Sequence, residues 1–436
     1  MARKILVLTV GGACEPIITS IKNHNPDFIY FVCSSDNSEN GKGSYLSIIG
    51  EGNVCRDKSN IVMQLSLQSN QYELVKLDID AEDDLDKTFE YLKSFLNELN
   101  KKNPNDEIIV DYTGGTKTMS AALVLSSVLI ENISISLVSG LRRDLVKVIN
   151  HTETATLINT KNIIVDNQLN LFNQLINNYD FAAAQNIIEK LIQSVKDRNI
   201  HKKLQRLRNI TQIFDLWDKF DHIGAFELLN LYTKEPKYFE YLLPLKAIIS
   251  ERKLIDSKFN IPESIKIDNK LNKDFILVVD LLLNAERKAK QGRYDDAVGR
   301  IYRACELFAQ LYLLKKFQLS TGNLEVEKLP EHLRKSFEDK RDKSNKVRIG
   351  LMDSYNLIHE LGDQTVGSKF YKNQKKFLSS LEIRNSSILA HGFTPITNEE
   401  FGEINDNLVL VIKSFIETVS QNSNIILNQF VNEIIP

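Results

Sequence analysis

The fold of the first third of the chain is decided by the stretch EIIVDYTGGTKTMSAALVLSSVL, residues 107–129. It starts with the apolar run of a buried strand, passes through a loop of small polar residues, and ends in an Ala- and Leu-rich segment typical of a helix. Further strands are predicted at Lys4–Val10, Phe28–Cys33, Glu73–Leu77 and Ile133–Val138, with a helix over Asp84–Leu99. This alternation predicts a Rossmann-like, doubly wound parallel sheet over residues 1–160.

Small polar residues gather where these predicted strands end, and that edge of a doubly wound sheet is where ligands bind. Glycines let the backbone approach a ligand, and a helix N-terminus attracts phosphate. The predicted ligand-binding residues are Thr9, Gly11, Gly12, Ser34, Ser35, Thr113, Gly114, Gly115, Thr116, Lys117 and Thr118. The loop has neither GxxxxGK[ST] nor GxGxxG spacing, so it favours an anionic or nucleotide ligand without indicating triphosphate hydrolysis. The alternative is a tight strand-to-helix turn without a ligand. Arg142 and Arg143 either add positive charge at this rim or are solvated surface residues.

The composition is that of an ordinary globular protein: 436 residues, 42% hydrophobic, 26% charged and a formal net charge of -2. Two or three domains are expected at this length. With no overall basic field, any contact with nucleic acid must be local. The four cysteines lack CxxC or zinc spacing and are predicted to be buried thiols in a reducing cytoplasm. We expect neither a signal peptide nor a membrane span.

The rest of the chain has helical patterns only. Residues 161–269 predict a helical connector, in which Trp217 is expected in the core and Asn260–Asn272 as a linker. Residues 270–436 predict an all-α bundle. Its expected helices are Lys273–Lys290, Asp295–Phe317, Phe377–His391 and Glu399–Asn432.

One stretch of this bundle, RNSSILAHG at residues 384–392, carries candidate catalytic chemistry. Arg384 and His391 are seven residues apart, which on a continuous helix places them on one face, two turns apart. An imidazole can take the proton of an RNA 2′-hydroxyl or protonate the leaving oxygen, and a guanidinium can hold the phosphate. Because the 2′-hydroxyl is the nucleophile, no metal or cofactor is required. The alternative is a surface arginine and a histidine that caps a helix.

Three stretches together resemble the CARF–HEPN proteins of type III CRISPR systems. They are DYTGGTKTM at residues 111–119, RYDDAVGRIYRACEL at residues 293–307 and RNSSILAHG. The resemblance covers residues 1–160, as a CARF-like sensing domain, and 270–436, as a HEPN-like helical bundle. It implies a homodimer whose sensing domains bind cyclic oligoadenylate, either the tetra-adenylate or the hexa-adenylate, and whose paired HEPN domains cut single-stranded RNA in antiviral defence.

The same resemblance assigns roles in the HEPN domain. It makes Arg384 and His391 the catalytic pair, with Asn385 and Ser386 supporting them. Arg303 and Glu306 either buttress this site or form an intrahelical ion pair.

Two other functions stay open from the sequence. The first is hydrolysis in the front domain, including slow cleavage of its own activator, for which Asp111, Thr9 and Lys117 are the nearby candidates. The second is a ligand-controlled adaptor without nuclease activity. Stable DNA binding is not expected, because no convincing helix-turn-helix with a basic recognition helix is found.

Overall fold

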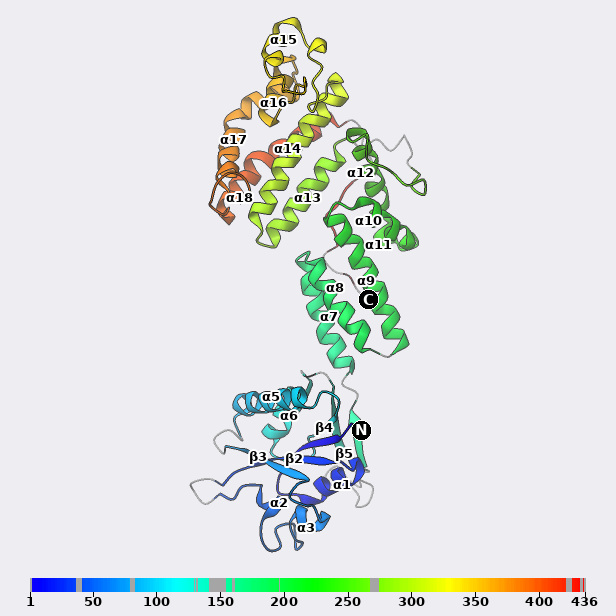
Figure 1. Cartoon of the computed structure of the whole chain (residues 1–436), viewed down its shortest axis with the longest axis vertical. Coiled ribbons are helices and arrows are strands. Elements are labelled where there is room, and N and C mark those ends of the chain that lie inside the picture. The colour runs from blue at the N-terminus through cyan, green and yellow to red at the C-terminus, as the bar shows by residue number, and fades with distance from the viewer. Residues whose placement is uncertain are drawn as a thin grey trace. The chain divides into compact units, whose positions relative to one another are not determined.

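The structure, a computed structural model, describes residues 2–36, 41–78, 83–128, 130, 132–140, 154–158, 161–195, 197–266, 274–420, 426–431 and 434. The chain forms two compact units, Met1–Asn167 and Gln168–Pro436 (Figure 1). Within the described ranges, no helix combines the length and the apolar character needed to cross a bilayer.

The first unit is built on a six-stranded sheet with the order β3-β2-β1-β4-β5-β6. The strands are β1 (Lys4–Thr9), β2 (Phe28–Ser34), β3 (Tyr72–Leu77), β4 (Glu107–Asp111), β5 (Ile133–Ser139) and β6 (Thr154–Ile158). Neighbours among β1–β5 pair in parallel, whereas β6 pairs antiparallel with β5. The five predicted strands and the Rossmann-like parallel sheet are confirmed, and β6 is an additional edge strand.

Helices cover both faces of this sheet, which explains the continuous apolar runs of its strands. The helices are α1 (Cys14–His24), α2 (Leu46–Ile49), α3 (Ile61–Leu65), α5 (Leu85–Lys102) and α6 (Lys117–Val128). Leu6 and Leu8 of β1 pack into a core shared with α1 and α3. Ile5 and Val7, which point to the other face, pack into a core shared with α5 and α6.

Helices are the only regular elements among the described residues of the second unit, in agreement with the predicted all-α bundle. Its first part contains α7 (Lys161–Asn177), which begins in the first unit, α8 (Phe181–Ser194), α9 (Arg198–Asp218), α10 (His222–Leu229), η1 (Asn230–Tyr232), α11 (Pro236–Phe239) and α12 (Leu242–Ile255). Its second part contains α13 (Ile276–Lys290), α14 (Tyr294–Phe317), η2 (Val326–Lys328), α15 (Glu331–Glu338), α16 (Leu351–Glu360), α17 (Val366–Ser386), α18 (Asn398–Ile404), a π-helix (Asn405–Val409) and α19 (Leu410–Val419).

Buried polar contacts join the connector helices to the C-terminal helices in this unit. Asp218 accepts from Arg287 Nε at 2.7 Å and from Lys288 Nζ at 2.5 Å. Trp217 is fully buried, as expected, and its indole N–H donates to Asp280 at 2.9 Å. Because these contacts are buried and link the connector to the C-terminal helices, the two helical parts form one packed body. Removing one partner of such a buried charge pair would be costly.

The predicted final helix, Glu399–Asn432, is wrong beyond Val419. Residues 421–425 lie outside the described residues, and residues 426–431 are not helical. In this last segment the ring of Phe430 packs against Trp217 at 5.2 Å and Phe214 at 5.1 Å, and Gln429 accepts from Arg287 Nη1 at 2.7 Å. Packing against the connector therefore overrides the helical spacing of the segment.

Candidate functional site

Two glycine-rich loops meet at the carboxyl ends of β1 and β4, the central pair of strands. The hydroxyl of Thr9 donates to the carbonyl oxygen of Gly114 at 2.6 Å. A Cβ atom on Gly11 would lie 3.0 Å from the backbone nitrogen of Gly115, and Gly115 has φ +83°. Glycines are therefore required here, because the two backbones approach too closely for side chains.

A cavity of about 420 Å³ opens at this edge of the sheet. Five of the predicted ligand-binding residues line it: Gly11, Gly12, Ser34, Gly115 and Thr116. The sequence predictions missed the opposite wall, which consists of Lys42, Gly43, Ser44, Leu46, Ser47 and Val54, and they also missed Val10 and Met119. The stretch GKGS at residues 41–44 was a signal for that wall, since it combines two glycines with a cation and a hydroxyl.

The six other predicted ligand-binding residues are not among those lining the cavity: Thr9, Ser35, Thr113, Gly114, Lys117 and Thr118. Thr9 is fully buried with its hydroxyl engaged, and the hydroxyl of Thr113 accepts from the backbone N–H of Val138 at 2.8 Å. Lys117 is an exposed residue at the first position of α6. These residues shape the loops around the cavity and do not line the cavity itself. Arg142 and Arg143 lie outside the described residues.

Asp111 serves as a buried acceptor below the cavity. It accepts from the hydroxyl of Ser20 at 2.8 Å and from the backbone N–H of Thr113 at 3.0 Å. Both contacts fix the start of the glycine loop. The Asp111 carboxylate therefore has a structural role, and it is poorly placed to catalyse hydrolysis.

The opposite wall is tied to the end of β2 by a reciprocal contact. The backbone N–H of Ser34 donates to the hydroxyl oxygen of Ser44, and the N–H of Ser44 donates to the hydroxyl oxygen of Ser34, both at 2.9 Å. Asp36 accepts from the N–H of Gly43 at 2.8 Å and from the hydroxyl of Tyr45 at 2.7 Å, and the Gly43 contact, followed by that of Tyr45, lowers the pKa of Asp36. Lys42 makes no ion pair with a described residue, so its charge is available to a ligand.

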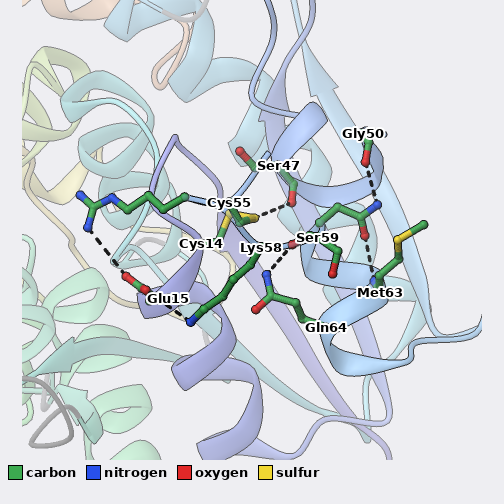
Figure 2. Close-up of a disulfide and its surroundings, with 11 residues drawn as sticks. Cys14, Glu15, Ser47, Gly50, Cys55, Lys58, Ser59, Met63 and Gln64 are labelled. Carbon is green, nitrogen blue, oxygen red and sulfur yellow. Dashed lines mark hydrogen bonds and ion pairs between the residues drawn. A yellow bond between two sulfur atoms is a disulfide. The ribbon is translucent and has the colours of Figure 1, made fainter. Parts of the chain in front are cut away.

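A disulfide joins the start of α1 to the segment behind this wall (Figure 2). Cys14 and Cys55 are bonded, which corrects the prediction that all four cysteines are thiols; Cys33 and Cys305 are free and buried. The spacing of 41 residues concealed this pair, because only the folded sheet brings the two segments together. Glu15 lies 3.9 Å from Arg56 and 3.8 Å from Lys58, so ion pairs flank the bond. The bond anchors the neighbouring residue Val54, which lines the cavity.

The second candidate site lies at the end of α17, and its geometry differs from the prediction. The helix ends at Ser386, and Ser387 is extended, with φ −76° and ψ 154°. The prediction that His391 lies in the last turn of this helix, on the same helical face as Arg384, is therefore wrong.

A backbone loop over residues 387–394 replaces the predicted last turn. The N–H of His391 donates to the carbonyl of Asn385 at 3.3 Å, and the N–H of Thr394 donates to that of Ser386 at 3.4 Å. A Cβ atom on Gly392 would lie 1.8 Å from the Ser386 carbonyl oxygen. The glycine that follows the histidine thus permits the loop to fold back over the helix end.

The predicted catalytic residues occupy this short segment with different surroundings. The Arg384 guanidinium lies over the Tyr302 ring at 4.3 Å, and its Nη1 donates to Asn385 Oδ1 at 3.0 Å. The hydroxyl of Ser386 donates to the backbone carbonyl of Ile383 at 2.7 Å. His391 is exposed. The arginine is therefore held in place by its neighbours, whereas the imidazole is accessible to a substrate.

Arg303 and Glu306, the other pair considered in this domain, lie 3.3 Å apart on α14. Arg303 also donates to Gln310 at 3.1 Å. Both contacts are within one helix, which agrees with the intrahelical ion pair.

The start of α17 is anchored by Asp363, and this contact predicts a pH dependence of stability. Burial opposes ionisation of Asp363, but hydrogen bonds from Lys316, the N–H of Gly367, Tyr312 and Thr365 outweigh it and lower the pKa from 3.8 to about 2. A lowered pKa stabilises the fold above pH 4, and this contribution disappears as the pH falls from about 4 to 2.

We expect Asp363→Asn to lower the free energy of unfolding at pH 7 by about 2 kcal/mol. The difference from the native chain should shrink in urea denaturation curves recorded at successively lower pH. A difference that stays constant down to pH 2 would contradict this role.

Comparisons with known proteins match each of the two units to a known kind of domain. Residues 26–168 match the family model described as the Card1 CARF domain, and residues 266–414 match the model described as the Csm6 HEPN domain. No curated protein matches the chain. The solved structure of Enterococcus italicus Csm6 bound to cyclic hexa-2'-fluoro-hexa-dAMP is 16% identical, with a TM-score of 0.57 over 95% of this chain and 94% of that one, so it shares the fold. The chain therefore carries a CARF domain in its first unit and a HEPN domain in its second, and this combination supports a CARF–HEPN ribonuclease.

Proposed function

We propose that this protein is a cyclic-oligoadenylate-activated endoribonuclease of type III CRISPR antiviral defence, which cuts single-stranded RNA without a metal ion. The observation that carries this proposal is the cavity between the two glycine loops and Lys42, whose backbone N–H groups and ammonium suit a phosphate ligand. The same chain has Arg384 and His391 within the residues matched as a HEPN domain. The activator class is supported by the Csm6 structure, which contains a cyclic hexa-dAMP analogue. Both the tetra-adenylate and the hexa-adenylate remain candidates.

The size of the cavity supports a homodimer as the binding form. A volume of about 420 Å³ is in the range that holds one drug-sized ligand. A ring of four or six adenylates is larger, so we propose that two copies of the first unit share it. Backbone N–H groups of the glycine loops and the Lys42 ammonium would then contact its phosphates.

In the proposed cleavage step, the accessible imidazole of His391 takes the proton of a ribose 2′-hydroxyl. The 2′-oxygen attacks the adjacent phosphorus, and the bond from phosphorus to the 5′-oxygen breaks. Arg384, fixed by Tyr302 and Asn385, stabilises the charge on the phosphate oxygens. His391 of the partner subunit protonates the leaving 5′-oxygen. The products are a 2′,3′-cyclic phosphate and a 5′-hydroxyl.

One experiment separates this proposal from its alternatives. Labelled single-stranded RNA is incubated with the protein in EDTA, alone or with cyclic tetra-adenylate or cyclic hexa-adenylate. We expect cleavage only with an activator, the products named above, and no cutting of RNA that is 2′-O-methylated throughout. Activator binding without cleavage would favour the adaptor, and degradation of the activator alone would favour a hydrolase in the front domain.

The cavity makes a separate prediction about Lys42. Removing its ammonium by Lys42→Ala should weaken activator binding about 10- to 100-fold, because hydrogen bonds to charged groups contribute about 1.5–3 kcal/mol. Isothermal titration calorimetry measures this change. Lys101→Ala is the matched control, since Lys101 is an exposed lysine at the end of α5, which leads to the opposite edge of the sheet. Equal affinities for the two variants would remove Lys42 from the site.

A further inference from the structure

The helix that leads to Arg384 has a charge unlike that of the chain as a whole. The formal net charge of the protein is -2. Along α17, VGSKFYKNQKKFLSSLEIRNS, five basic residues stand against the single acidic residue Glu382. Any contact with RNA phosphates must be local in such a protein, and this helix is a local concentration of positive charge.

Three of these lysines face solvent on the same side of the helix. Lys372, Lys375 and Lys376 are exposed, and none of them forms an ion pair with a described residue. By contrast, Lys369 donates to the hydroxyl of Thr418. Unneutralised neighbouring charges repel one another, so the exposed face of α17 would gain from a polyanionic partner.

Exposed aromatic rings lie beside the lysines on α17 and in the loop that follows the helix. Tyr371 is 62% exposed, and its ring stacks on the imidazole of His359 with centroids 4.7 Å apart. Phe393 is 92% exposed and lies two residues after His391, in the loop that Gly392 allows to fold back. A ring exposed in this way offers a face on which a nucleic-acid base can stack.

We infer that the α17 track, defined as Tyr371, Lys372, Lys375, Lys376 and Phe393, binds the single-stranded RNA substrate and leads it to Arg384 and His391. The lysines contact phosphates while the rings stack on bases, which is the combination used by proteins that bind single strands. The twelve-residue path from Lys372 to Arg384 spans about 18 Å of helix. This inference rests on the proposed ribonuclease function.

RNA fits this surface better than a protein does. The buried centres of protein interfaces are depleted in lysine, whereas the α17 track has three lysines close to an exposed tyrosine. The track also ends at the residues proposed to act on a phosphodiester.

The test measures binding apart from cleavage. Fluorescence anisotropy follows a labelled, fully 2′-O-methylated single-stranded RNA, which cannot be cut by its own 2′-hydroxyl, over a series of salt concentrations. The variant is Lys372→Gln, Lys375→Gln and Lys376→Gln together. The matched control is Lys202→Gln, Lys203→Gln and Lys234→Gln, which removes three exposed lysines from the connector. Tyr371→Ala with Phe393→Ala forms a second variant.

We expect the triple α17 variant to reduce the slope of log affinity against log salt by about 2, since each single-strand phosphate contact contributes about 0.7. The aromatic variant should lose about tenfold or more in affinity with the slope unchanged. The connector variant should bind like the native chain. In cleavage assays on ordinary RNA, the triple variant should raise KM with kcat retained at saturation.

Two results would overturn the inference. In one, the native chain cuts RNA but the triple variant keeps its affinity and slope, so the track fails while the ribonuclease stands. In the other, light scattering shows that the variant loses its oligomeric state, so the surface is a protein interface. A native chain that binds no RNA and cuts none would instead reject the ribonuclease proposal itself.

Discussion

His391→Ala is expected to lower activator-dependent RNA cleavage by about 10²- to 10⁴-fold, the usual contribution of a general acid or base. The imidazole is exposed in a loop and is not buried in the bundle, so its removal should leave the fold intact. Binding of 2′-O-methylated RNA and of the activator should stay within about twofold of the native values, because the proposed role of His391 is proton transfer in the transition state.

The matched control for this prediction is His332→Ala, which removes another exposed histidine from the same unit, on α15. It should cleave at the native rate. Added imidazole should partly restore cleavage in His391→Ala, because a small base can enter the vacated position, and this rescue distinguishes a catalytic from a structural role. Undiminished cleavage by His391→Ala would mean that another site cuts the RNA.

A substitution of Arg384 should also reduce RNA cleavage. Arg384→Lys keeps the positive charge but loses the planar guanidinium that lies over Tyr302 and bonds Asn385. We expect it to lose kcat rather than RNA affinity, since a flexible ammonium can still attract phosphate but no longer holds a fixed position.

The strands could be predicted because burial on two faces leaves an unmistakable pattern. Lys4–Thr9 and Phe28–Ser34 are nearly continuous apolar runs, and the structure places both between other strands of the sheet. Strand β6, with the sequence TATLI, was missed because it lies at an edge and is mostly exposed, so neither a continuous run nor a clear alternation marks it.

The sites were only partly predictable because tertiary contacts complete them. The glycine loops after β1 and β4 could be recognised from local sequence, but the wall at residues 42–54 depends on the reciprocal contact of Ser34 with Ser44 and on a bond to α1. At the end of α17, regular spacing suggested a continuous helix to His391. The close approach of Gly392 to the Ser386 carbonyl shows why the helix ends earlier, and spacing alone cannot reveal such an approach.

The bond between Cys14 and Cys55 should contribute one of the largest stabilising effects in the first unit. It closes a loop with a sequence separation of 41 residues, for which the chain-entropy model gives about 4 kcal/mol. Cys14→Ser with Cys55→Ser, or reduction by dithiothreitol, should therefore lower the free energy of unfolding of this unit by up to that amount. Urea denaturation followed by circular dichroism measures the change.

The two units provide an internal control for this last prediction. The only tryptophan of the chain, Trp217, lies in the second unit, so its fluorescence reports unfolding there. Dithiothreitol should shift the circular dichroism transition of the native chain but not its fluorescence transition, and it should have no effect on the double serine variant.

Four alkylatable thiols in the unreduced, denatured protein would contradict the bond. Because Cys55 adjoins Val54 in the cavity wall, loss of the bond should also weaken activator binding, while RNA binding by the second unit should not change.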